Sequence, residues 1–125
     1  MADISFDSKG LAVFTAKYHG EVSLSEKKWA IICFQPERRY YKYNGEKIPT
    51  TLINPDHVRR HKFNPNQFLY YKKFERYRVT ETAEVPLRSG FCCVILDVST
   101  KRICTVFPTR KIKKGKEFRP KGHSG

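Results

Sequence analysis

The chain has 125 residues, with 25 Lys or Arg against 12 Asp or Glu, so its formal net charge is +13. The length fits one compact domain. Contents of 39% hydrophobic and 14% aromatic residues are too high for a disordered chain. No apolar run approaches the roughly 20 residues that span a bilayer, and the N-terminus lacks the layout of a signal peptide. We therefore expect a cytoplasmic protein without membrane contact.

The first part of the chain predicts one strand and two helices. Residues 11–22 are β-prone but irregular, which favours a strand interrupted near Gly20. Ser23 and Glu26 have the spacing of a capping box, which predicts a helix that ends at about Phe34. A second short helix is expected over residues 46–53, and its inward-facing residues would be Ile48, Leu52 and Ile53.

The second half of the chain predicts strands. We expect them at residues 56–61, 67–74, 91–98 and 101–107. Helices followed by an antiparallel sheet are typical of the α+β class. The predicted fold is therefore α+β, with N-terminal helices packed on a twisted antiparallel β-sheet formed mainly by the second half of the chain. Residues 1–118 would form a single basic domain, and residues 119–125 a flexible tail.

The cysteines favour a structural role over a metal site or a disulfide framework. None of them forms a Cys-x-x-Cys pair, and each lies in an apolar run, as expected for small core residues. They are Cys33, Cys92, Cys93 and Cys104. We therefore expect neither a metal nor another cofactor.

The positive charge indicates an anionic partner, because self-repulsion on this scale destabilises a compact chain. Basic and aromatic residues occur together in three clusters, at residues 38–43, 70–78 and 110–121. Lys and Arg neutralise phosphates, and aromatic rings stack on unpaired bases, which favours RNA or a single strand over duplex DNA. The nucleic-acid-binding candidates are Arg38, Tyr70, Lys72, Arg110, Lys111 and Lys113. The alternative is a solvated strand surface with its tyrosines turned inward.

Histidines supply the candidate acid–base groups, since their proton moves near neutral pH. On a strand, His57, Arg59 and His61 would share one face. A ribonuclease that works without a metal needs a base for the 2′-hydroxyl, an acid for the leaving 5′-oxygen and donors around the phosphorane. The catalytic candidates are His57, His61, Arg59 and Thr105, the last on a strand where Ile103, Thr105 and Phe107 would share a face. The alternative is a solvent-facing basic strand.

Several segments together carry a family resemblance. A Trp29-containing helix precedes Pro36-Glu37, the element Thr51-Leu52-x-x-Pro55-Asp56 follows, and the last strand reads Ile103-x-Thr105-x-Phe107. From about Ser23 to Lys116, this order resembles the phage- and mobile-element-associated domains of the barnase, colicin and RelE-like ribonuclease superfamily.

The resemblance implies an α+β domain with its RNA cleft on the sheet face, and toxin-like cleavage of RNA without a metal. By position it carries functional roles over to Arg59, Lys72, Thr105 and Arg110. One departure is that Ala30 and Gln35 stand where such domains often carry histidines. Either His57 or His61 has then taken the proton-transfer role, or the chain binds RNA without cutting it.

The resulting hypothesis is a small basic RNA-binding domain that acts as a metal-independent endoribonuclease by 2′-hydroxyl attack. An acidic inhibitor or antitoxin protein would be a further partner. Two alternatives remain open: a non-enzymatic nucleic-acid-binding protein with basic-aromatic surfaces, and an adaptor that docks on an acidic protein.

Overall fold

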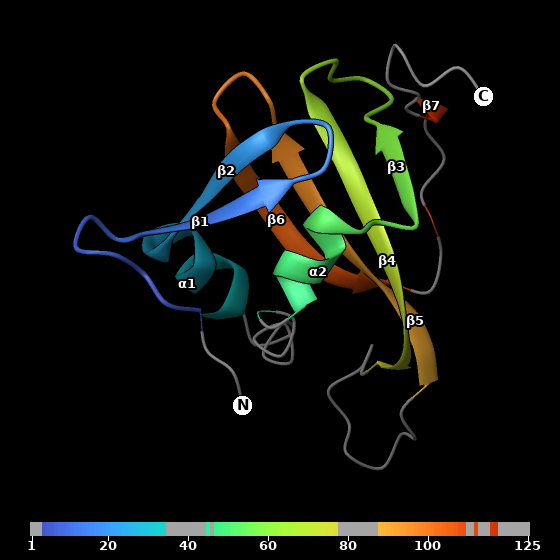
Figure 1. Cartoon of the computed structure of the whole chain (residues 1–125), viewed down its shortest axis with the longest axis horizontal. Coiled ribbons are helices and arrows are strands. Elements are labelled where there is room, and N and C mark those ends of the chain that lie inside the picture. The colour runs from blue at the N-terminus through green and yellow to red at the C-terminus, as the bar shows by residue number, and fades with distance from the viewer. Residues whose placement is uncertain are drawn as a thin grey trace.

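A computed structural model gives the fold, and the structure describes residues 4–34, 45, 47–77, 88–109, 112 and 116–117. These residues contain two short helices and seven strands (Figure 1). In chain order the elements are β1 (Leu11–Ala16), β2 (Gly20–Ser25), α1 (Glu26–Phe34), α2 (Ile48–Ile53), β3 (His57–Arg60), β4 (Gln67–Tyr77), β5 (Arg88–Asp97), β6 (Arg102–Thr109) and β7 (Lys116–Glu117).

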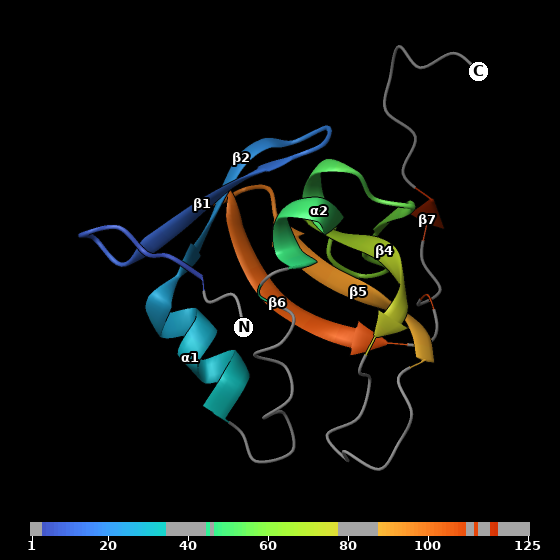
Figure 2. The ribbon, with the colours of Figure 1, turned by 60° about the horizontal axis from the view of Figure 1, so that its bottom comes forward.

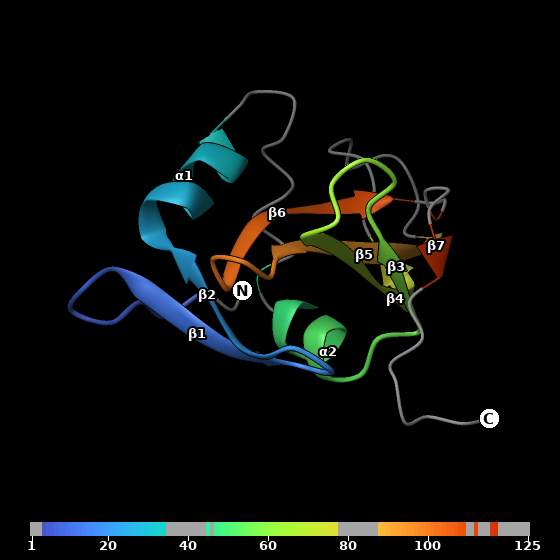
Figure 3. The same cartoon turned by 90° about the horizontal axis from the view of Figure 1, so that it is seen from above.

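All seven strands belong to one sheet in the order β1-β2-β6-β5-β4-β3-β7. Neighbouring strands are antiparallel except β2 and β6, which are parallel and pair at Ser23 and Arg102. The apolar strand β5 lies in the middle of this order. The sheet curves around α2, which lies between the β1–β2 hairpin and strands β4 and β5 (Figures 2 and 3).

The predicted fold class is wrong, because the described part of the chain is mostly β and its sheet is mixed. The error lies at residues 11–25, which form a complete β-hairpin that joins the same sheet. In β1 the inward positions include the small residues Ala12 and Ala16, while the larger Val13 points outward and is 56% exposed. This distribution hides the alternation of a half-buried strand.

The two helices are close to their expected positions. Helix α1 ends at Phe34 as predicted, but the hydroxyl of Ser25, not Ser23, caps it by accepting a hydrogen bond from the backbone N–H of Lys28 at 3.0 Å. Ser23 lies within β2. Helix α2 buries Ile48 and Leu52 as expected, whereas Ile53 is 52% exposed and the prediction for it is wrong.

The sheet has two faces with different packing. One face, here called the α2 face, carries the row Val58–Tyr70–Val94–Val106, and these residues share a core cluster with Ile48 and Leu52 of α2. The opposite face, here called the His57 face, carries the neighbouring row His57–Tyr71–Cys93–Phe107. Its smaller cluster contains, among the described residues, only side chains of β4, β5 and β6 together with Ile112.

The cysteines with described side chains pack in these two clusters. Cys92 lies on the α2 face, while Cys93 and Cys104 belong to the cluster of the His57 face. All three are free thiols, and both Cys92 and Cys93 are fully buried. The expected core role is therefore confirmed for Cys92 and Cys93.

Candidate functional site

The strand register places three of the four catalytic candidates on one face. His57 and Arg59 lie two residues apart on β3, opposite Tyr71 and Leu69 of β4. Thr105 lies in the same row as Arg59, because Leu69 pairs with Ile95 and Ile95 pairs with Thr105. All of these residues therefore belong to the His57 face.

The ring of His57 packs beside the aromatic side chain of Phe91. The half-buried His57 ring lies 6.3 Å from the centroid of Phe91 at an interplanar angle of 65°. Phe91 in turn meets the fully buried Tyr71 edge-on, at 6.3 Å and 90°. Edge-to-face contacts of this kind fix ring orientation. The imidazole therefore stands in a defined position at the margin of an apolar surface.

Thr105 is too far from His57 and Arg59 to share a reaction centre with them. Strands β3 and β6 are three strand spacings apart, which is about 14 Å along the sheet. A bulge in β6 also separates Thr105 from Ile103, because Leu96 pairs with Ile103 whereas Ile95 pairs with Thr105. The prediction that Ile103 and Thr105 share a face is wrong, and Ile103 is a core residue of the α2 face.

His61 has a structural role in the β3–β4 loop. Its ring nitrogen Nδ1 accepts hydrogen bonds from the backbone N–H groups of Phe63 at 3.1 Å and Asn64 at 3.0 Å. Because a backbone N–H can only donate, Nδ1 carries no proton in this arrangement and Nε2 carries it. A base needs an unprotonated nitrogen directed at its substrate. The geometry therefore favours His57 over His61 for proton transfer.

Tyr70 is not a stacking platform, contrary to its predicted nucleic-acid-binding role. The side chain is fully buried on the α2 face, and its hydroxyl donates to the backbone carbonyl of Lys17. The same oxygen accepts from Nδ1 of His19 at 2.5 Å. Burial raises the pKa of Tyr70 above its ordinary value. Its ring and hydroxyl therefore contribute to the core.

His19 lies at the end of the β1–β2 hairpin, on the α2 side. Its ring packs on Phe68 at a centroid distance of 4.5 Å. Because the Tyr70 hydrogen goes to Lys17, Nδ1 of His19 must be the donor of the His19–Tyr70 bond. Partial burial, followed by the charge of Lys101, lowers the pKa of His19. Burial therefore favours the neutral form of His19, which is set apart from His57.

Lys72 also lies on the α2 face, in register with the buried Cys92. Its ammonium group is 3.4 Å from Oδ1 of Asp56. The pKa of Asp56 is lowered, mainly by a hydrogen bond from the backbone N–H of Lys73 and further by Lys72. The strand directs Lys72 away from His57, so the structure does not bring Lys72 together with Arg59, the residue expected to hold the same phosphate.

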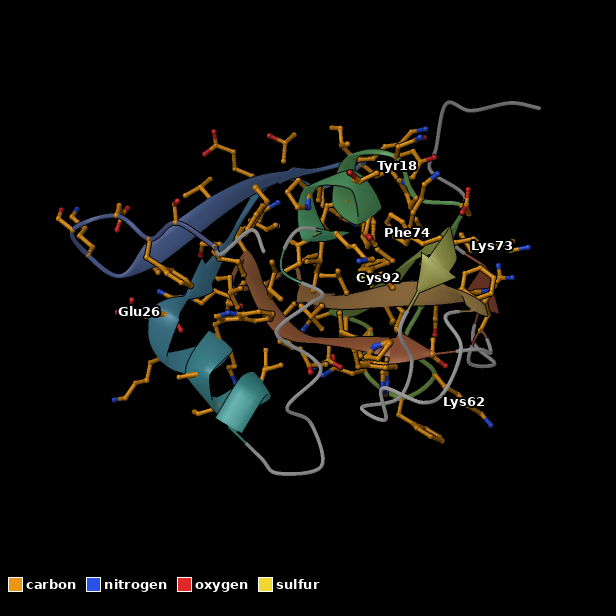
Figure 4. All side chains as sticks on the ribbon, turned by 90° about the horizontal axis from the view of Figure 1, so that it is seen from below. Tyr18, Glu26, Lys62, Lys73, Phe74 and Cys92 are labelled. Atoms are coloured by element: carbon orange, nitrogen blue, oxygen red, sulfur yellow. The ribbon has the colours of Figure 1, made fainter. Side chains whose placement is uncertain are left out.

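Lys73 is a candidate binding residue that the family resemblance did not indicate. It pairs with Phe91 on the His57 face, and it is the diagonal neighbour of His57, since His57 pairs with Tyr71. Diagonal neighbours on adjacent strands lie about 7–8 Å apart, within reach of a long side chain. Lys73 is exposed, and its side chain extends outward from β4 (Figure 4). Strand alternation alone would have found it.

The remaining candidates lie outside the described residues. They are Arg38, Arg110, Lys111 and Lys113. Gln35, which stands where the similar ribonuclease domains often carry a histidine, also lies outside the described residues. Ala30 is half-buried on α1. Among the residues that the structure describes, no cluster of three or more His, Cys, Asp or Glu is arranged to hold a metal ion. No described helix has the length and apolar character that crossing a membrane requires.

No family model, no curated protein and no solved structure matches this chain. The ribonuclease resemblance therefore rests on its sequence motifs, and the site rests on the geometry of the His57 face.

Proposed function

We propose that this chain binds RNA on the His57 face and cleaves it as a metal-independent endoribonuclease. One observation carries the proposal: His57 stands between two cationic residues, Arg59 on its own strand and Lys73 diagonally opposite on β4. A histidine flanked by cations on an apolar surface is suited to a reaction at a phosphodiester, whose charge grows in the transition state.

Arg59 and Lys73 would hold the RNA backbone. Arginine forms paired hydrogen bonds with phosphate oxygens, and lysine adds a point charge. Phe91 and Phe107 leave part of their rings exposed on the same face, where they can contact bases. The net charge of +13 attracts the polyanion over a longer range.

In the proposed reaction the 2′-oxygen forms a bond to the adjacent phosphorus, and the bond from phosphorus to the 5′-oxygen breaks. His57 accepts the proton of the 2′-hydroxyl and returns a proton to the leaving 5′-oxygen. Arg59 donates hydrogen bonds to the phosphorane oxygens. The products are a 2′,3′-cyclic phosphate and a free 5′-hydroxyl, so the proton balance closes without another reactant.

A second candidate function is RNA binding without cleavage. The distance of about 14 Å between β3 and β6 favours it, because Thr105 cannot assist a reaction at His57. In both functions Thr105 would contact the RNA away from His57, and His61 would organise its loop.

Cleavage decides between the two functions. Purified protein is incubated with total RNA in the presence of a chelator, and the new ends are mapped. We expect 2′,3′-cyclic phosphate ends and a loss of cleavage of about 10²- to 10⁴-fold in His57→Ala. The control is His19→Asn, which removes a histidine from the α2 side and should cleave at the wild-type rate. Retention of RNA without any cleavage would leave only the binding function.

We further propose that the protein acts in the cytoplasm and that an acidic protein inhibits it by covering the His57 face. An inhibitor of this kind would block RNA binding by wild-type protein and would bind Arg59→Ala more weakly. Imaging of a tagged chain in its host tests the compartment.

A further inference from the structure

We infer that Phe63 is a preformed stacking platform for an unpaired base of the RNA that the His57 face holds, an inference that rests on the proposed function. Phe63 is 82% exposed, more than any other large hydrophobic side chain among the described residues. It lies in the β3–β4 loop, immediately beyond the strand that carries His57 and Arg59. Core packing does not account for an aromatic ring in this position.

The loop around Phe63 is held by hydrogen bonds although the ring itself is exposed. Nδ1 of His61 accepts from the backbone N–H groups of Phe63 and Asn64. Oδ1 of Asn64 accepts from the N–H of Asn66 at 3.0 Å, and the carbonyl of Asn66 accepts from the N–H of Val98 at 2.8 Å. A platform fixed in advance loses little conformational entropy when a ligand covers it.

Phe63 lies at the border of the His57 face. His61 directly follows Arg60, the last residue of β3, and its ring lies 6.4 Å from that of Phe63. Lys62 places its ammonium group 5.4 Å from the Phe63 centroid. In Figure 4 Lys62 lies on the side of the sheet opposite α2. The platform thus adjoins the surface assigned to the phosphates.

The ligand that fits this arrangement is a single-stranded segment of RNA. A base can stack on the exposed ring, while its phosphate is neutralised by Lys62. In a duplex both faces of an internal base are already stacked, so such a base cannot use the platform. The substrate is therefore RNA with at least one unpaired nucleotide beside the phosphate held by Arg59.

The chain contains a matched control for this surface. Tyr18 in the β1–β2 turn is 42% exposed, and the ammonium group of Lys17 lies 5.3 Å from its ring. Tyr18 lies on the α2 side of the sheet in Figure 4. The two loops therefore present the same kind of lysine–aromatic pair on opposite sides of the sheet.

The test compares Phe63→Ala, Phe63→Trp and Tyr18→Ala by fluorescence anisotropy with a labelled single-stranded RNA and a blunt RNA duplex. We expect Phe63→Ala to weaken single-strand binding about 5- to 150-fold, the loss that corresponds to one base stack. Phe63→Trp should retain the affinity, and its new indole fluorescence should be quenched by the RNA. Tyr18→Ala should bind as wild type, and duplex binding should be similar in all three variants.

Other outcomes overturn the inference in distinguishable ways. If wild-type protein binds RNA, Arg59→Ala does not, and Phe63→Ala binds as tightly as wild type, the platform is wrong while the proposed function stands. Equal losses in Phe63→Ala and Tyr18→Ala would likewise exclude a specific platform. Wild-type protein that retains no RNA at low salt overturns both. If Phe63 bound a partner protein and the chain bound no RNA, that result would also contradict the stacking-platform inference.

Discussion

Neighbouring residues of β4 contribute to two different surfaces. Tyr70 and Lys72 point to the α2 face, where one is hydrogen-bonded in the core and the other pairs with Asp56. Tyr71 and Lys73 point to the His57 face, beside a half-buried histidine. Because the two faces share one backbone, the difference comes from what packs on each. Both faces bury core side chains, and the His57 face, which also carries half-buried His57 and exposed Lys73, is the one that we propose meets RNA.

The largest expected effects separate these two faces. Leu96→Ala removes a fully buried side chain from the α2 face and should lower the free energy of unfolding by about 2–5 kcal/mol. Its folded fraction should keep the RNA affinity of wild type. Arg59→Ala should weaken RNA binding about 10- to 150-fold, because a charge-assisted hydrogen bond of about 1.5–3 kcal/mol is lost.

Urea unfolding and RNA titration of both variants provide the measurement. If Leu96→Ala weakened RNA binding as much as Arg59→Ala, the assignment of RNA binding to the His57 face would be wrong.

The next largest effect concerns the Tyr70 hydroxyl. Tyr70→Phe leaves the carbonyl of Lys17 and Nδ1 of His19 without their hydrogen-bond partner at a largely buried site. We expect a loss of about 1–3 kcal/mol in unfolding free energy and no change in RNA affinity. Tyr18→Phe changes a side chain that is 42% exposed, and it should lower the unfolding free energy less than Tyr70→Phe does. If Tyr70→Phe bound RNA more weakly than wild type and Tyr18→Phe did not, Tyr70 would have to belong to the RNA interface.

A smaller effect is the pH dependence that His19 introduces. Its pKa is lowered in the folded chain, by burial and then by Lys101, whereas the unfolded chain keeps the ordinary value of about 6.5. Between these two values the unfolded chain binds more protons, so the unfolding free energy rises with pH. This stability is fully present above about pH 6.5 and is lost as the pH falls toward the folded value.

The comparison of wild type with His19→Asn isolates this contribution, because His57 and His61 are present in both proteins. Urea unfolding between about pH 8 and pH 5 should show a shallower loss of stability in His19→Asn. Asp56 does not interfere, since its lowered pKa places its own contribution in a more acidic range. Identical slopes would mean that His19 does not titrate differently on folding.

The sequence predicted local structure better than architecture. Helix α1, helix α2 and the second-half strands have strong signals, such as the position of Pro49 in the first turn and the apolar run in β5. The β1–β2 hairpin was missed because its inward positions are occupied partly by alanines. The fold class depended on this segment. Because the alternation in it was not recognised, the α+β class was predicted for a fold that is mostly β.

The sequence predicted which residues share a face of the sheet where that depends only on the alternation of side chains along a strand. His57 and Arg59 share a face because they lie two residues apart on an uninterrupted strand. Alternation fails at Thr105, since the bulge in β6 separates it from Ile103 and no local residue pattern marks that bulge. The role of His61 depends on hydrogen bonds within its loop, which residue spacing does not reveal.

The most direct test of the central claim uses two adjacent lysines of β4. Lys72→Ala and Lys73→Ala remove the same charge from opposite faces, so general attraction of the polyanion changes equally in both. Titration with a single-stranded RNA over a range of salt concentrations measures affinity and the number of phosphate contacts. We predict that Lys73→Ala binds more weakly than Lys72→Ala and lowers the slope of log K against log salt by about 0.7, while Lys72→Ala keeps the wild-type slope. Equal losses in the two variants, or a loss confined to Lys72→Ala, would contradict RNA binding on the His57 face.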